Sequence, residues 1–156
     1  MIHATDPFPP VTRYSPVFSA TGLTFTGANS TYPTYNSYYV KHGQLVSFWI
    51  KIDLNTVTNF GTAQLKVELP FTPYDSTMNH FPGWCWYDPS IPADSTNHII
   101  LNVDHLPASK TLDFHWLAAD PTNPKPVREE LFTPTSPFTL TTSSKIYVNG
   151  TYISAE

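Results

Sequence analysis

Residues 44–54 read QLVSFWIKIDL, and apolar and polar side chains alternate along them with a period of two. This period is typical of a β-strand, whose successive side chains point to opposite faces. One face carries Val46, Phe48, Ile50, Ile52 and Leu54, and the opposite face carries Leu45, Ser47, Trp49, Lys51 and Asp53. We therefore predict a strand with one face on the core and one toward water.

Residues 63–69 repeat the alternation, with Ala63, Leu65, Val67 and Leu69 on one side, and Pro70 ends the run. We expect this stretch and 44–54 to pair as antiparallel neighbours. Apolar runs predict further strands at 80–87, 97–104, 111–117, 138–140 and 146–153, with a tight turn or bulge at Asn149-Gly150. Residues 127–132 fit either one helical turn or a strand.

The pattern as a whole predicts an all-β fold. Short strands are separated by Pro, Gly, Asn and Asp turns, and no segment has a helical period. We predict a jelly-roll-like antiparallel β-sandwich, formed as a single domain by residues 14–156. Residues 1–13 are rich in proline and predict an extended N-terminal arm with polyproline II character.

Composition excludes several classes of function. The chain has 12 acidic and 8 basic residues and a net charge of −4, so no basic stripe is present and nucleic-acid binding is not expected. No apolar run approaches the roughly 20 residues that cross a bilayer, so we expect no membrane partner. Because the first residues lack a signal-peptide pattern, we expect synthesis in a reducing cytoplasm. The single cysteine, Cys85, excludes an intrachain disulfide.

The usual signatures of catalysis are missing from the sequence. It contains no Gly-x-Ser-x-Gly motif, no phosphate-binding glycine loop and no distinctive carboxylate pair. Histidines and aspartates on two neighbouring predicted strands fit a His-Asp-His metal group; they are His98, Asp104, His105, Asp113 and His115. Polar side chains are expected on a solvated strand face, so we interpret these as solvated or hydrogen-bonded. We predict no enzyme, no metal and no cofactor.

Surface aromatic residues are the best candidates for binding. The loop at 29–39 is rich in tyrosine, which gives large rigid contact area at low entropic cost. Trp49 lies on the polar face of its strand, which indicates that a second sheet or another subunit covers that face. The candidate interface consists of Phe8, Pro9, Pro10, Tyr32, Tyr35, Tyr38 and Trp49.

Four segments share a further pattern of strands and turns, namely Tyr14–Leu23, Tyr39–Val46, Phe60–Leu65 and Val67–Phe71. Together with Phe138–Thr142 and Gly150–Tyr152, they resemble a β-domain found in virion structural proteins of tailed bacteriophages. The resemblance implies a head decoration or knob protein, or the distal domain of a tail fibre. It carries no catalytic residues.

A proline-rich arm followed at once by one β-domain favours a capsid decoration, cement or knob protein. Such a protein binds the major capsid protein or other virion proteins, and we expect a homo-oligomer, with a trimer favoured. Its place is then the virion. One alternative is a tail-fibre or baseplate receptor-binding domain that contacts a host glycan. Another is a small lectin-like carbohydrate-binding module, although an Asp/Asn cluster for calcium is missing.

Overall fold

The computed structural model describes residues 9–25, 34–74, 79–86, 98–105, 109–119, 127–137 and 139–156. These residues form thirteen strands and one 3₁₀ turn, η1 at Leu54–Thr56, without an α-helix. The first seven strands are β1 Thr12–Tyr14, β2 Phe18–Ser19, β3 Leu23–Phe25, β4 Thr34–Tyr35, β5 Ser37–His42, β6 Leu45–Asp53 and β7 Val57–Phe60. The other six are β8 Lys66–Glu68, β9 Asn79–Trp86, β10 His98–His105, β11 Thr111–Ala119, β12 Val127–Leu131 and β13 Lys145–Ile153.

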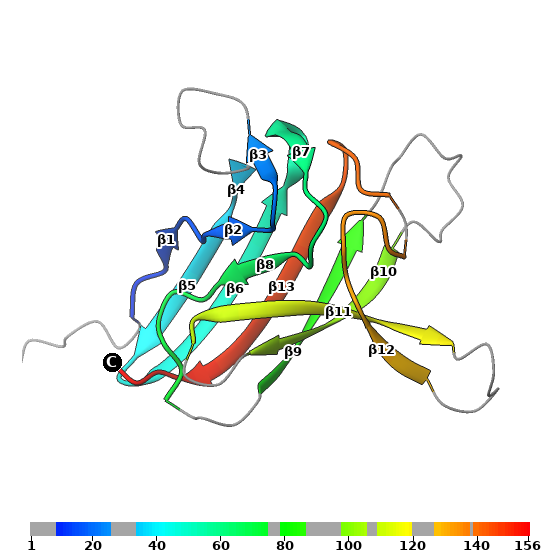
Figure 1. Ribbon diagram of the computed structural model, residues 1–156. Coiled ribbons are helices and arrows are strands. Elements are labelled where there is room, and N and C mark those ends of the chain that lie inside the picture. Colours follow the sequence, from blue (N-terminus) through cyan, green and yellow to red (C-terminus); the bar gives the residue numbers. More distant parts are fainter. Residues whose placement is uncertain are drawn as a thin grey trace, which may run out of the picture.

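One antiparallel sheet contains most of the strands, in the order β1-β5-β6-β13-β9-β10-β11-β8-β2. In addition, β12 pairs with β11, β4 pairs with β6, and β3 and β7 form a small sheet of their own. Figure 1 shows β5, β6 and β13 running side by side, with β8 and β11 lying across them. The sheet therefore curls over on itself, as in a β-sandwich or barrel, and the predicted all-β antiparallel fold is confirmed.

The two ends of the curled sheet are close together along the chain. Only residues 15–17 separate β1 from β2, which are the two edge strands of the main sheet. The amide of Glu68 donates to the carbonyl oxygen of Val17 over 2.9 Å, which holds this link against β8. Thr12 and Arg13 already belong to β1, so the sheet begins two residues inside the range predicted for the arm. Residues 1–8 lie outside the described residues.

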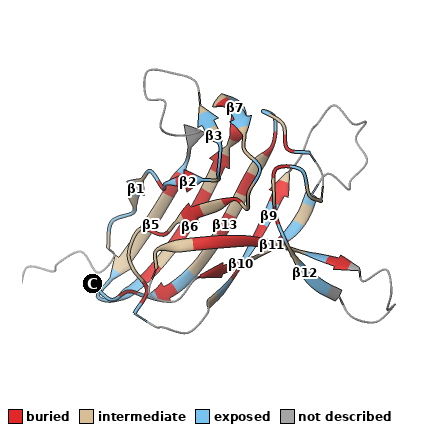
Figure 2. Cartoon of the chain, viewed as in Figure 1, coloured by how far each residue is buried: buried red, intermediate tan, exposed pale blue. Residues whose placement is uncertain are grey.

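The core lies between the two layers. From β6 and η1 it takes the five apolar residues predicted by the alternation, each at most 2% exposed: Val46, Phe48, Ile50, Ile52 and Leu54. Figure 2 shows the buried segments in red along β6, β8, β11 and β13. Burying a side chain of this size stabilises the fold by about 1.5–3 kcal/mol. The predicted inward face is confirmed.

The predicted pairing of 44–54 with 63–69 is wrong. Strand β8 pairs with β11 and β2, while β6 pairs with β13, β5 and β4. Leu65, Val67 and Leu69 are buried as their alternation predicts, but they reach the core from the opposite layer. Alternation determines which face of a strand is buried and says nothing about which strand lies beside it.

The C-terminal half brings two more corrections. Of the two alternatives for 127–132, the structure has the strand, β12. The strand predicted at 138–140 is not formed at Thr139 and Leu140, which lie outside any strand. No turn occurs at Asn149-Gly150, because β13 pairs with β6 without interruption from Lys145 to Ile153. A Cβ at Gly150 would collide with Cδ1 of Phe81 and come within 3.1 Å of Cε1 of Phe48. This glycine makes room for two core rings.

Candidate functional site

The outer surface of the curled sheet carries side chains in rows that cross several strands. In one row, Lys51, Tyr147, Trp84 and Ile100 are successive partners from β6 to β10. In the next row, Asp53, Lys145, Trp86 and His98 are partners in the same way. Because side chains directly opposite each other in a sheet are in contact range, these rows place aromatic and charged groups together.

A hollow of about 480 Å³ opens at these rows. We call it the aromatic hollow, and it is lined by Trp84, Trp86, His98, Lys145 and Tyr147. The rings of Trp84 and Tyr147 are stacked, with centroids 5.0 Å apart and an angle of 11° between their planes. The ammonium group of Lys145 lies 5.1 Å from the centroid of the Trp86 ring. The hollow thus combines apolar ring surface with two side chains that donate hydrogen bonds.

The structure brings together two of the seven predicted interface residues. Tyr38 on β5 is the direct partner of Trp49 on β6, and the tyrosine hydroxyl donates to the side-chain oxygen of Asn36. Trp49 is 49% exposed, so no second sheet covers it within the part of the chain that the structure describes. The prediction that another subunit covers this face stays a prediction.

Of the other five predicted residues, the structure describes Pro9, Pro10 and the backbone of Tyr35. Tyr35 lies on β4 beside Ile52, and the orientation of its side chain is outside the description. Pro9 is half-buried and Pro10 is exposed. Phe8 and Tyr32 lie outside the described residues.

An aliphatic patch adjoins the aromatic hollow on β9, β10 and β11. It consists of Pro82, Ile100 and Leu117, which line a shallow hollow of about 410 Å³. Ile100 is 74% exposed and Leu117 is 53% exposed, which is unusual for such large aliphatic side chains on neighbouring strands. This patch was not predictable from the sequence, because β10 and β11 each show the pattern of a strand with an apolar inner face.

Next to this patch lies a cluster of ionisable side chains, which we call the polar cluster. Asp104 on β10, His115 on β11 and Glu129 on β12 each place a nitrogen or oxygen atom within 4.8 Å of the others. His80 on β9 donates from Nδ1 to Oδ1 of Asp104 over 2.6 Å. The side-chain amide of Asn102 donates to Glu129. The cluster therefore spans four adjacent strands.

Only part of this cluster was visible in the sequence. Asp104 and His115 belong to the His-Asp-His group considered above, whereas His80 and Glu129 come from strands that the sequence could not place beside them. Three other members of that group lie elsewhere. His105 is buried and donates to the carbonyl oxygen of Ser109, Asp113 forms an ion pair with Lys66, and His98 lines the aromatic hollow.

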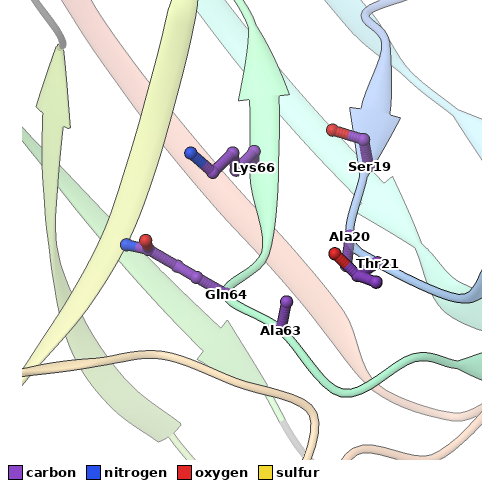
Figure 3. Close-up of a pocket in the computed structure, with 6 residues that line it drawn as sticks. All are labelled: Ser19, Ala20, Thr21, Ala63, Gln64 and Lys66. Carbon is purple, nitrogen blue, oxygen red and sulfur yellow. The ribbon is translucent and has the colours of Figure 1, made fainter.

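A further hollow, between β2 and β8, has no group of ionisable side chains comparable with the polar cluster. It has a volume of about 330 Å³ and is lined by Ser19, Ala20, Thr21, Ala63, Gln64 and Lys66. Figure 3 shows that Gln64 and Lys66 extend toward β11. There Gln64 donates to the carbonyl oxygen of Phe114 over 3.2 Å, and the ammonium group of Lys66 lies 3.3 Å from Asp113. Both polar side chains are thus used within the fold.

The single cysteine has no reactive character. Cys85 is fully buried in the core, and its burial raises the pKa of the thiol far above the ordinary value. A thiol that stays protonated is a poor nucleophile and a poor metal ligand. Cys85 therefore packs as a small apolar residue of the core.

Comparisons with known proteins identify no relative: the chain matches no family model, no curated protein and no solved structure. Among the described residues, no helix has the length and apolar character needed to cross a bilayer.

Proposed function

We propose that this chain is a non-catalytic structural subunit of a tailed-phage virion, namely a capsid decoration, cement or knob protein. Its outer sheet surface binds copies of itself and other virion proteins, such as the major capsid protein. One observation carries this proposal. Seven large apolar residues on the strands of the main sheet are exposed to solvent: Leu45, Trp49, Trp84, Ile100, Leu117, Leu131 and Ile153.

Exposed apolar surface of this kind supports a protein partner. Contiguous apolar patches on a folded domain mark interaction sites, and tryptophan and tyrosine are enriched at the centres of protein interfaces. Ile100 lies beside Trp84 and Leu117, so the patch is continuous over β9, β10 and β11. Trp49 and Tyr38 form a second aromatic pair on β5 and β6, nearer the other edge of the sheet. The virion context rests on the resemblance of the four sequence segments described above.

Two measurements test this proposal together. The purified full chain is sized by light scattering after gel filtration, and its binding to expanded capsids and to host cells is measured by pull-down. We expect a small cyclic oligomer, with a trimer favoured, that binds capsids but not cells. Trp49→Ser and Ile100→Ser should weaken assembly or capsid binding, because each removes apolar area from the interface.

A matched control variant tests whether the loss of binding is specific to the proposed interface. Tyr74 is also a large exposed side chain, at 70%, but it lies outside the strands of the main sheet. Tyr74→Ser should therefore leave assembly and capsid binding unchanged. A monomer that binds no capsid would contradict the proposal, as would equal losses in all three variants.

A second candidate function is glycan binding, and the aromatic hollow favours it. Apolar faces of sugar rings pack against aromatic side chains, while Lys145 and His98 can hydrogen-bond to hydroxyl groups. In that case the chain is a receptor-binding tip or a lectin-like module. Trp86→Ala should then abolish binding to host cells or to a glycan array, while capsid binding is absent from the start. Capsid binding that persists in Trp86→Ala would favour the decoration role.

A further inference from the structure

The polar cluster has the donor set and the spacing of a transition-metal site. It offers one imidazole nitrogen, from His115, and one carboxylate oxygen each from Asp104 and Glu129, all within 4.8 Å of one another. These three residues lie on adjacent strands as diagonal neighbours, each two residues away from direct pairing with the next, so the sheet holds them near one another. We propose that Asp104, His115 and Glu129 bind one Zn²⁺ ion, with water completing the coordination.

The distance between His115 and Asp104 fits two ligands of one metal ion better than it fits a direct hydrogen bond. Nε2 of His115 lies 3.6 Å from Oδ2 of Asp104 and 3.5 Å from the side-chain nitrogen of Gln64. Both separations are long for a hydrogen bond, so neither Asp104 nor Gln64 is a strong direct partner of this nitrogen. Two ligands at about 2.0–2.2 Å from a tetrahedral Zn²⁺ ion lie about 3.3–3.6 Å apart. The 3.6 Å between His115 and Asp104 is therefore close to the distance between two zinc ligands, and the three atoms, which lie within 4.8 Å of one another, would close further around the ion.

Charge also favours a cation at this place. The side chain of Asp104 is only 7% exposed, and a buried carboxylate is costly unless it has a compensating partner. The ionisable partners of Asp104 are His80 and His115, which carry a positive charge only when they are protonated. Arg128 pairs with Glu130, and Lys66 pairs with Asp113. A divalent cation would balance the two carboxylates.

Two further side chains are placed as orienting groups. His80 donates to Oδ1 of Asp104 over 2.6 Å, which leaves Oδ2 directed at His115. Asn102 donates to one oxygen of Glu129. Hydrogen bonds of this kind fix the orientation of metal ligands and raise metal affinity. The imidazole ligand selects zinc and its neighbours in the first transition row over calcium and magnesium.

Metal binding would have a structural consequence. Among the described strands, β12 pairs only with β11. Glu129 therefore lies on a strand that one neighbour holds to the sheet. An ion shared by Glu129, His115 and Asp104 would connect β12 to β10 across β11. Glu129 also borders the aliphatic patch, so the ion would fix the edge of that surface.

The test is titration of the full chain with ZnSO₄ after treatment with EDTA, followed by isothermal calorimetry. We expect one ion per chain with micromolar or tighter affinity, and a rise in Tm with Zn²⁺ but not with Ca²⁺. His115→Gln and Glu129→Gln should each weaken binding by about tenfold or more. The controls His42→Gln and Glu130→Gln change exposed or neighbouring groups outside the cluster and should bind Zn²⁺ as the unchanged chain does.

A spectroscopic measurement separates a specific site from nonspecific binding. Co²⁺ in place of Zn²⁺ should give visible absorption bands typical of a low-coordinate nitrogen and oxygen site, and His115→Gln should remove them. His80→Gln should shift these bands and reduce affinity while circular dichroism shows an unchanged fold. Failure of the chain to bind Zn²⁺ at micromolar concentration would overturn the proposal. Zn²⁺ binding that survives in both His115→Gln and Glu129→Gln would do so as well.

Discussion

The indole ring of Trp84 stacks on the phenol ring of Tyr147, with centroids 5.0 Å apart and planes within 11° of parallel. The two residues are direct partners on β9 and β13, and the ammonium group of Lys51 lies 5.7 Å from the Tyr147 centroid on the same face. Aromatic pairs of this kind stabilise a sheet beyond the area that they bury. The pair therefore links the fold to the proposed binding surface.

A double-mutant cycle on Trp84 and Tyr147 should show this coupling. We expect Trp84→Ala and Tyr147→Ala to be non-additive in the free energy of unfolding by about 0.5–1.5 kcal/mol. Urea denaturation of the four proteins in the cycle measures the coupling. The pair Trp49 and Ile153, both exposed on adjacent strands but not partners in register, gives the comparison. Strict additivity for Trp84 and Tyr147 would show that the stack contributes nothing to stability.

The elements that alternate most regularly were predictable from sequence, because a period of two needs only local information. Residues 44–54 became β6 with the predicted face buried, and 97–104 and 111–117 became β10 and β11. Strand pairing was not predictable in this way. Residues 63–69 have the same alternation whether they pair with β6 or face it across the core, and the structure shows the second arrangement.

The candidate sites were predictable only in part, for the same reason. Trp49 stood out because it is an indole on an otherwise polar face; no second sheet covers it in the described part of the chain, and cover by another subunit stays a prediction. The polar cluster takes His80, Asp104, His115 and Glu129 from four strands, so it exists only once the strand order is known. No spacing of residues in the sequence indicates such a site. The predicted turn or bulge at Asn149-Gly150 was wrong, because a glycine needed for close packing cannot be distinguished in the sequence from one needed for a turn.

Gly150→Ala should destabilise the protein. The added methyl group collides with the ring of Phe81 and crowds Phe48, and both rings are buried in the core. Overpacking of this kind costs about 1–3 kcal/mol. Urea denaturation measures the loss, and Asn149→Ala on the outer side of the same strand is the control. Equal stability of Gly150→Ala and the unchanged chain would mean that Phe81 moves aside freely.

Tyr152→Phe should be destabilising although it removes a single atom. The Tyr152 hydroxyl donates to the carbonyl oxygen of Phe71 over 2.9 Å and accepts from the amide of Phe71 over 3.1 Å. Its removal leaves two backbone groups without their partner, at a cost of about 1–3 kcal/mol. Tyr74→Phe changes an exposed tyrosine and should be neutral. A loss shared by both variants would point to a general effect of removing hydroxyl groups.

Stability should fall in alkaline solution because of three buried acids. Burial is the largest cause of the raised pKa values of Tyr14, Cys85 and Tyr152 in the folded chain. All three groups stay protonated when folded, whereas the unfolded chain loses these protons near the ordinary pKa values of about 8.5 for cysteine and about 10 for tyrosine. The unfolded state then binds fewer protons, so the free energy of unfolding falls as pH rises through this range.

The slope of this fall measures how many groups contribute. Each group adds up to about 1.4 kcal/mol per pH unit once the pH exceeds its unfolded pKa. Urea denaturation between about pH 8 and pH 11 should therefore show stability that is level at first and then declines. Tyr14→Phe should be at least as stable at pH 8, because the buried hydroxyl that it removes has no hydrogen-bond partner, and should decline less steeply, because one ionising group is gone. A flat profile up to pH 11, or an unchanged slope in Tyr14→Phe, would show that these side chains are solvated in the folded protein.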